Sequence, residues 1–533
     1  MKINICKIEK ITFYTLLALA LSIIIIPKFY LTGDGPSHTY NAKVLADYLL
    51  NNNRDFYKPF YEINRNLDPN WTSQILLAIF TKIFPYWLAD KVFQIIYVCV
   101  FAFGFRYLIQ SLNKTTNLLT LFFYPFCFTL PFQLGYYNYS LGLGLLFFLF
   151  TFYMQNRKQL SSFNQLGILI GSFILVFTHA MAATHFLMLC ALVIIQDAIH
   201  LYKEKKNIKT IFENLIPNLI IFTPIVLVII GFTMRQGLAT TPHALTIIQK
   251  TFNFLCLYCC QSTLIVEKIP AICFGIGILF FACIIIIKGN CNNKITRNTF
   301  LLFTIYTLLA YLNAPGTVAY NGIDIRLAFL PPLFFVLALS TYEINSKINI
   351  AILFFAGIIQ ISFLALRFST VLNVSNEIEN ILSISKNIDT KKNVLAIQYN
   401  THGSLHQFEL DNSFLHIFDY IGAMKNKQLI ILNNYEADLN YFGVQWRAGK
   451  NPRLAMPNII LGKAPTPTEL NNYKSIAAID YIILQNKMQT NAVATDNDYL
   501  QLQTYLQSNY SKTDSIQSLQ LELWKANSPK LSK

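Results

Sequence analysis

Long apolar runs recur along the first two thirds of the chain and are separated by short polar breaks. A helix crosses the hydrocarbon core of a bilayer with about 20 residues, or with somewhat fewer where the membrane is thin. The runs therefore predict eleven membrane-spanning helices. They cover residues 11–31, 87–110, 118–133, 139–155, 163–178, 181–199, 212–232, 270–287, 299–313, 326–340 and 348–367. Two more runs, 71–84 and 251–266, fit either interfacial helices or additional spans.

Two polar stretches between these runs are too long to be simple connections. Residues 32–70 follow the first run, and residues 233–269 follow the seventh. Loops longer than about 15 residues are usually functional or ordered on their own. We therefore expect a transmembrane domain over residues 1–370 that carries both stretches as external loops.

The pattern changes in the tail, residues 371–533. Short β-type runs stand at 394–399, 429–432, 479–484 and 519–524, separated by helical periodicity at 404–424 and 496–507. This alternation predicts a small C-terminal α/β domain. The tail has neither a Gly-rich phosphate loop nor the nucleophile turn of α/β-hydrolases, so we do not expect the chemistry there. The expected fold class is thus a polytopic α-helical membrane protein with a small extracytoplasmic α/β domain.

Composition supports the membrane assignment and excludes other classes. Of 533 residues, 54% are hydrophobic and only 13% are charged, whereas soluble domains carry about 25% charged residues. A chain with a mean hydropathy of +0.42 cannot bury all its apolar surface in a soluble core. Composition therefore excludes a soluble enzyme and a disordered scaffold.

The distribution of charge predicts the orientation in the membrane. The chain has 42 Lys and Arg against 27 Asp and Glu, a net charge of +15. Nearly all of this excess precedes residue 371, which is typical of membrane topology and not of nucleic-acid binding. The short turns near Gly135, Thr178 and Pro315 hold no Lys or Arg, whereas the alternate loops are basic. We expect a bacterial inner membrane protein with a cytoplasmic N-terminus and, after eleven spans, a periplasmic tail.

The ten cysteines all lie between Cys6 and Cys291, mostly within apolar runs. Cys256, Cys259 and Cys260 resemble a metal cluster, but no His or acidic residue stands at a zinc spacing from them. Small apolar packing residues are the simpler interpretation. We assign no metal ligand in the chain.

The most informative polar segment is Thr32-Gly33-Asp34-Gly35-Pro36-Ser37-His38, directly after the first span. Its glycines permit a tight turn, and Pro36 suits the first position of a helix. The residues that follow are apolar at helical spacing, with Lys43 and Asp47 on the opposite face, which predicts an interfacial helix. Asp34 is either a helix cap or a catalytic group at the membrane surface, with His38 beside it.

This layout resembles the GT-C superfamily of integral membrane glycosyltransferases. The shared features are about eleven spans, an acidic residue in the first external loop, amphipathic helices in that loop and an external α/β tail. The segment Asp68-Pro69-Asn70-Trp71, leading to Phe84-Pro85, resembles the helix that closes this loop before the second span. The resemblance covers the layout of nearly the whole chain, but its local motif is short.

The resemblance implies a polyprenyl-phosphate-linked sugar donor and an acidic residue that acts as catalytic base or metal ligand. Asp34 matches this position. Many such sequences carry a second acidic residue next to the first, whereas Gly35 follows Asp34 here. This departure counts against the metal-dependent version, although the resemblance leaves a divalent cation open as a cofactor.

Other polar residues near the outer ends of the spans are candidates for substrate binding. His179 and Arg326 suit a lipid phosphate, and Asp324 stands beside Arg326. Tyr137 and Asn138 belong to an aromatic turn that could line a sugar site. The alternatives are bundle histidines for His179 and His185, an Asp324–Arg326 ion pair or a snorkelling arginine, and an interfacial aromatic belt.

The expected function is transfer of a sugar from a polyprenyl-phosphate donor to an extracytoplasmic glycan, lipid or protein acceptor in the cell envelope. Asp34 would remove the acceptor proton, His38 would orient the acceptor or Asp34, and Arg326 with His179 would neutralise the leaving phosphate. Two alternatives remain. One is a transporter or flippase of lipid-linked sugars, and the other is a non-catalytic assembly protein of the membrane.

Overall fold

The computed structural model of the chain forms two compact units. Residues 1–26 and 94–369 form one, here the helical unit, and residues 27–93 and 370–533 form the other, here the mixed unit. The structure describes residues 5–50, 53–66, 68–113, 116–158, 160–204, 208–236, 245–260, 265–291, 293–314, 322–399, 414–439, 441–457, 459, 464–485 and 497–527. The expected turn at Pro315, residues 237–244 and 261–264 of the second external loop, and residues 404–413 of the tail lie outside these ranges.

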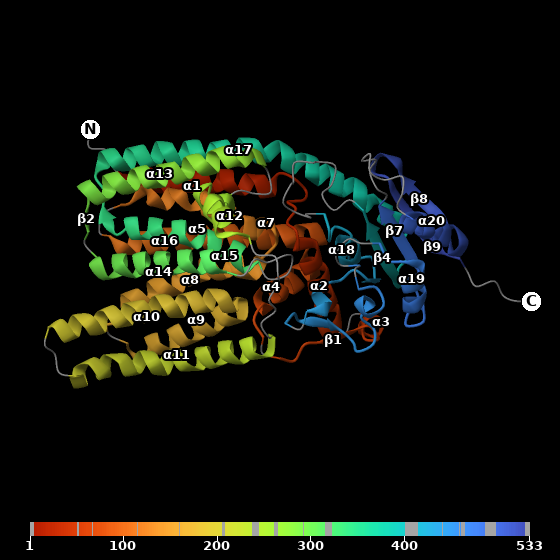
Figure 1. Cartoon of the computed structure of the whole chain (residues 1–533), viewed down its shortest axis with the longest axis horizontal. Helices are drawn as coiled ribbons and strands as arrows, with labels where there is room; N and C mark the ends of the chain where they lie inside the picture. Colours follow the sequence, from red (N-terminus) through yellow and green to blue (C-terminus); the bar gives the residue numbers. More distant parts are fainter. Residues whose placement is uncertain are drawn as a thin grey trace, which may run out of the picture. The chain divides into compact units, whose positions relative to one another are not determined.

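Long apolar helices make up the helical unit (Figure 1). Within the described residues, eight helices are long and apolar enough to cross a membrane. These eight correspond to α1 (Ile5–Ile25), α5 (Tyr86–Leu112), α8 (Tyr137–Asn156), α10 (Ala180–Lys203), α11 (Ile208–Gln236), α13 (Lys268–Lys288), α14 (Lys294–Asn313) and α17 (Ser346–Leu382). The chain is thus a multi-pass helical membrane protein. Helices α5 and α17 extend across the boundary into the mixed unit.

The three other expected spans are shorter or interrupted. Residues 118–133 divide into η1 (Leu118–Phe122), α6 (Phe123–Cys127) and α7 (Leu130–Gln133). Residues 163–178 form the 17-residue helix α9 (Ser162–Thr178), and residues 326–340 divide into α15 (Ile323–Ala328) and α16 (Leu330–Leu339). Proline accounts for two of these breaks, because Pro131 and Pro331 stand at helix starts, where the missing N–H costs nothing. The count of eleven spans stays a prediction.

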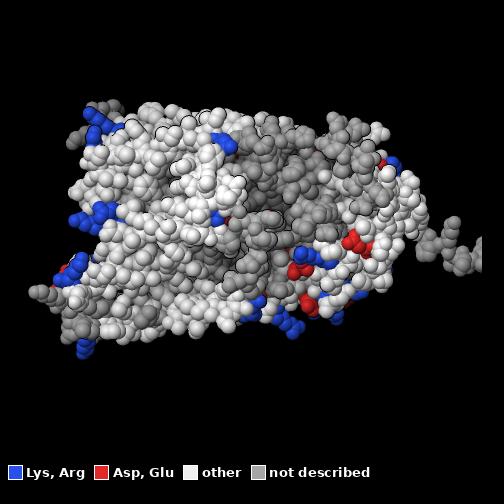
Figure 2. Space-filling view, in the orientation of Figure 1, with Lys and Arg blue, Asp and Glu red and all other residues white. Residues whose placement is uncertain are grey.

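Polar contacts connect several helix ends on one side of the helical unit. Arg106 donates two hydrogen bonds to Glu9, at 2.9 and 2.8 Å. Strand β2 (Asn290–Cys291) pairs with β3 (Tyr342–Glu343), and Asn113 donates to the Tyr342 carbonyl at 3.1 Å. These contacts join the start of α1, the end of α5, the α13–α14 turn and the start of α17. On the face in view, Figure 2 shows Lys and Arg at this end and little charge along the helices.

A five-stranded sheet organises the tail part of the mixed unit. Its strand order is β5-β4-β7-β9-β8, with β4 parallel to β5 and β7, and β9 antiparallel to both of its neighbours. The strands are β4 (Lys392–Gln398), β5 (Leu429–Ile431), β7 (Tyr481–Gln485), β8 (Tyr510–Ile516) and β9 (Leu521–Ala526). The sequence did not reveal β8, because this edge strand is mostly polar and largely exposed. Helices α18 (Asp419–Ala423), α19 (Pro467–Lys474) and α20 (Asn497–Asn509) lie in the connections.

Residues 32–70, the predicted first external loop, belong to the mixed unit. They form α2 (Gly35–Leu49), α3 (Arg54–Tyr57) and β1 (Tyr61–Ile63), and α4 (Trp71–Ile83) follows them in the same unit. Strand β1 pairs with β6 (Val444–Trp446) of the tail, and the rings of Tyr61 and Trp446 lie 4.5 Å apart. Residues 32–70, which we assigned to the transmembrane domain, cluster with the tail, and the expected domain division stays a prediction.

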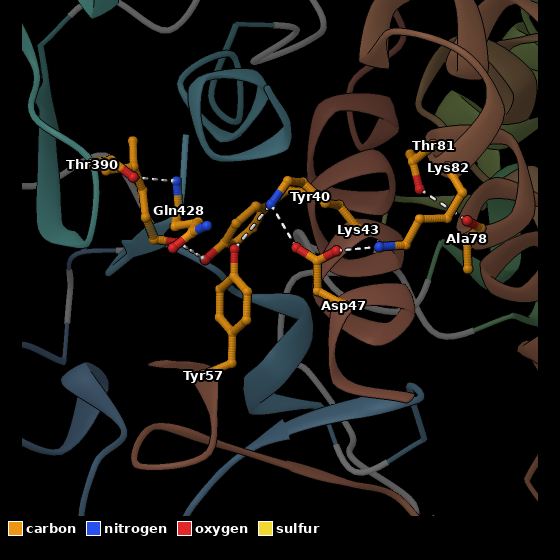
Figure 3. Close-up of polar contacts among 10 residues, drawn as sticks. Tyr40, Lys43, Asp47, Tyr57, Ala78, Thr81, Lys82, Thr390 and Gln428 are labelled. Carbon is orange, nitrogen blue, oxygen red and sulfur yellow. Dashed lines mark hydrogen bonds and ion pairs between the residues drawn. The ribbon is translucent and has the colours of Figure 1, made fainter. Parts of the chain in front are cut away.

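Helix α2 is not the interfacial helix that its pattern predicts, because both of its faces are buried in the mixed unit. Lys43 donates to Asp47 and to the Tyr57 hydroxyl, both at 3.0 Å, and Lys82 of α4 forms an ion pair with Asp47 (Figure 3). The polar face of α2 therefore packs inside the unit, where its charges are paired. Helix α4 is amphipathic instead, since Ile79 and Ile83 are exposed while Gln74 is buried.

A buried tyrosine links α2 to the edge of the sheet. The Tyr40 hydroxyl accepts a hydrogen bond from the Ile431 amide at 3.0 Å and donates one to the Leu429 carbonyl at 2.9 Å. Helix α18 approaches closely at Gly422, where a Cβ atom would lie 2.5 Å from the Tyr40 ring. Only glycine fits between α2 and β5 at this point.

We expect Tyr40→Phe to destabilise the chain by about 1–3 kcal/mol, because it leaves two buried main-chain groups of β5 without a partner. The measurement is chemical unfolding of the detergent-solubilised full chain. Tyr505→Phe is the matched control, since it removes a hydroxyl that bonds only a side chain, Asn471, at 2.8 Å. Equal stability of Tyr40→Phe and the wild type would contradict the role of this link.

Candidate functional site

Asp34 stands at the start of α2 but does not cap the helix. Its backbone has φ −90° and ψ −6°, and its side chain makes no capping hydrogen bond. Capping residues usually adopt the extended region, which directs the side chain toward the first helical amides. The Asp34 side chain is 24% exposed. The capping interpretation therefore does not describe this carboxylate.

Two aromatic side chains from the tail lie beside Asp34. His416, in the turn before α18, places its Nε2 atom 3.8 Å from Asp34 Oδ1. The His416 ring stacks on Tyr435, with 4.3 Å between ring centroids and 24° between planes. Tyr435 lies four residues after the end of β5. Burial raises the pKa of Tyr435, and the charges of Asp34 and Glu436 and a hydrogen bond to Asp34 raise it further.

A fully buried glutamate holds the loop and the tail together next to this group. Glu436, in η5 (Glu436–Asp438), has no exposed surface and pairs with His38 of α2. Its Oε2 atom also accepts hydrogen bonds from Asn41 at 3.0 Å and from Gln74 at 2.8 Å. The structure thus places His38 against Glu436, and its predicted role toward Asp34 or the acceptor remains untested.

Burial determines the charge of two further members of the cluster. Burial raises the pKa of Asp419 to about 8; a hydrogen bond from Ser37 opposes this shift, and the Glu436 and Asp34 carboxylates add to it. Burial, and secondarily the charge of His38, lowers the pKa of His416 to about 3. At neutral pH the Asp419 carboxyl is therefore mostly protonated and the His416 imidazole is neutral.

In the helical unit, Arg326 and His179 gather around an aromatic side chain. The Arg326 guanidinium lies 4.2 Å from the Tyr136 ring centroid and 5.8 Å from that of Tyr139. The Tyr139 hydroxyl donates to the Arg326 carbonyl at 2.6 Å, and the His179 ring meets the Tyr139 ring edge-on at 5.2 Å. His179 also caps α10, because its Nδ1 accepts from the Met181 amide at 3.2 Å. Two of the predicted substrate-binding residues thus share one neighbour.

The other candidates of this unit have separate contacts. The Tyr137 hydroxyl accepts a hydrogen bond from Gln94 at 2.8 Å, and Asn138 is buried. Asp324 is buried too, and it accepts a bond from the Ile325 amide at 2.9 Å. His185 is buried and packs edge-on against Phe303 within the bundle.

The donor groups do not make a metal site in the part of the chain that the structure describes. No group of three or more His, Cys, Asp or Glu is arranged there to hold a metal ion. The described residues therefore show no ready-made ligand set for the divalent cation that the resemblance left open, and the cation stays a prediction.

The sequence did not reveal the tail residues of this cluster. We dismissed the tail because it lacks a known motif, yet His416, Asp419, Tyr435 and Glu436 all come from it. One signal was present: the polar run Asn433 to Glu436 directly follows the β-type run that becomes β5. The carboxyl ends of parallel strands commonly carry binding groups.

No protein-family model matches the chain, and no curated protein matches it significantly. The chemistry of the cluster is read from its own groups. A partly exposed carboxylate lies beside a neutral imidazole and a protonated acid, while the other acid, Glu436, is fully buried. Asp34 is therefore the group best placed to take a proton from a ligand.

The raised pKa of Asp419 predicts how stability depends on pH. An aspartate in an unfolded chain titrates near about pH 4, so its contribution to stability is complete below that pH. It is lost as pH rises through about 8, because the folded chain gives up this proton later than the unfolded chain. We expect the free energy of unfolding of the wild type to fall between pH 6.5 and 8, relative to Asp419→Asn, by up to about 1.4 kcal/mol per pH unit.

The measurement is chemical unfolding of both proteins in detergent across that interval. His416 is neutral in the folded chain over this interval, and its titration in the unfolded chain near about pH 6.5 is the same in both proteins, so it cancels in the comparison. Parallel pH profiles for the two proteins would show that Asp419 is not held protonated.

Proposed function

We propose that the chain is a membrane glycosyltransferase of the GT-C type, which moves a sugar from a polyprenyl-phosphate donor to an extracytoplasmic acceptor. The observation that carries this proposal is Asp34. It follows the first membrane helix, does not cap α2, and is partly exposed while the acids around it are buried. An exposed carboxylate among neutral and buried groups suits a general base better than a structural residue.

In the proposed reaction, Asp34 removes the proton from an acceptor hydroxyl or amine. The acceptor oxygen or nitrogen forms a bond to the anomeric carbon, and the bond from that carbon to the phosphate oxygen breaks. The polyprenyl phosphate leaves with the electron pair, so the sugar is transferred with inversion. Arg326 of the helical unit is proposed to bind the lipid phosphate, because a guanidinium held by aromatic rings can still donate to phosphate oxygens.

The proposal includes an orientation in a bacterial inner membrane. The basic helix ends, with Lys7, Lys10, Lys294 and Lys347, would face the cytoplasm, as short basic segments usually do. The tail would then lie in the periplasm. The site needs no nucleotide, since polyprenyl-phosphate donors already carry an activated sugar.

We expect Asp34→Asn to lower sugar transfer by at least about 100-fold, because the amide cannot accept the acceptor proton. The assay uses proteoliposomes and a panel of radiolabelled polyprenyl-phosphate hexoses and pentoses, with cell-envelope extract as acceptor. Asp55→Asn is the control, since Asp55 is an exposed acid of the same loop. Full transfer by Asp34→Asn would rule out the base.

The same proteoliposomes separate the main alternative. A flippase would move a fluorescent polyprenyl-phosphate sugar between leaflets without consuming it. Neither the wild type nor Asp34→Asn would then transfer the sugar. We expect the wild type to release polyprenyl phosphate in the presence of acceptor. Movement of the intact donor lipid with no release would favour the transporter.

A reporter fusion tests the orientation. Alkaline phosphatase is active only after export, so a fusion at the C-terminus should be active and a fusion at the α13–α14 turn should be inactive. The reverse pattern would contradict both the periplasmic tail and the access of Asp34 to an external acceptor.

A further inference from the structure

We propose that His416 and Tyr435, both from the tail, are positioning residues that fix the Asp34 carboxylate in the orientation needed for proton abstraction. This inference rests on the proposed role of Asp34 as base. It assigns the tail a direct part in the reaction, although the sequence suggested an accessory domain.

The contact between His416 and Asp34 is polar but loose. The Nε2 to Oδ1 distance of 3.8 Å exceeds a hydrogen bond, and catalytic contacts are often long before a ligand binds. A neutral imidazole carries one N–H, and we place it on Nε2, facing the carboxylate. Such a donor orients Asp34 without adding a positive charge that would weaken it as a base.

Tyr435 restrains both partners. Its ring supports the His416 ring at 4.3 Å, and its hydroxyl bonds Asp34. The backbone of Tyr435 is fixed on both sides along the chain. Glu436 is held by His38, Asn41 and Gln74, and the Asn434 carbonyl accepts a bond from Trp446 Nε1 at 3.1 Å. A tyrosine anchored in this way can define one orientation of the carboxylate.

The charged and titratable groups around Asp34 come from four segments. They are His38 on α2, His416 in the turn before α18, Asp419 on α18, and Tyr435 with Glu436 after β5. Of these, Tyr435 is hydrogen-bonded to Asp34, and His416 directs a neutral imidazole toward it at 3.8 Å. Losing such a donor makes the charged carboxylate less stable, so Asp34 should then bind its proton at higher pH.

The test measures Asp34 directly. The detergent-solubilised full chain is treated with a water-soluble carbodiimide across a pH series, and modification of the Asp34 peptide is read by mass spectrometry. We expect the midpoint of modification to rise by about one pH unit in Tyr435→Phe and in His416→Phe. His416→Phe keeps an aromatic ring to stack on Tyr435 and removes both ring nitrogens. Tyr505→Phe, whose hydroxyl bonds Asn471, should leave the midpoint unchanged.

In the transfer assay, both variants should lower kcat by about 10- to 100-fold and change the donor KM less than about twofold. A structural role alone would lower the amount of folded protein and leave the midpoint unchanged. An unchanged midpoint in both variants, or an unchanged kcat in both, overturns the proposal. Failure of the base itself is distinct, because only Asp34→Asn with full transfer would show it.

Discussion

The buried carboxylate of Glu436 is the interaction on which the mixed unit depends. It has no exposed surface; its partners His38 and Asn41 come from the predicted first external loop, and Gln74 comes from α4, which follows that loop. A buried carboxylate is costly unless it is paired and hydrogen-bonded, and removing one partner of such a group typically costs about 3–5 kcal/mol. Glu436 therefore requires the loop to dock on the tail in one arrangement.

This constraint gives the three acids of the cluster different properties. Glu436 holds the loop against the tail. Asp419 is buried and keeps its proton to about pH 8, and Asp34 remains partly exposed to solvent. Three neighbouring carboxylates could not all ionise in a buried site, because like charges raise one another's pKa. The protein separates them by exposure, which leaves one carboxylate available to a ligand.

The parts of this structure that the sequence predicts are those set by local pattern. Hydropathy located each of the eight long apolar helices among the described residues, because lipid requires continuous apolar residues. Pro131 and Pro331 were visible as well, and their effect on the runs at 118–133 and 326–340 could have been anticipated. Periodicity likewise located β4, β5, β7 and β9 to within a few residues.

The site depends on contacts that no local pattern contains. Asp34 could be selected from its place after the first span, but Asn41 and Glu436 are 395 residues apart in the chain. Helix α2 misled because its amphipathic pattern suggested a membrane surface, whereas Tyr57 of α3 and Lys82 of α4 contact its polar face inside the mixed unit. Pairing partners far along the chain are not specified by spacing, so the tail's contribution became visible only in the fold.

The most direct test of this account is hydrogen–deuterium exchange of the full chain in detergent, comparing wild type with Glu436→Gln. If Glu436 joins the loop to the tail, amides of α2 and of β5 should lose protection together in the variant. Glu469→Gln, which alters an exposed helix cap of the tail, should leave both segments protected. Loss of protection in β5 with α2 unchanged would contradict the claim that loop and tail form one unit around this carboxylate.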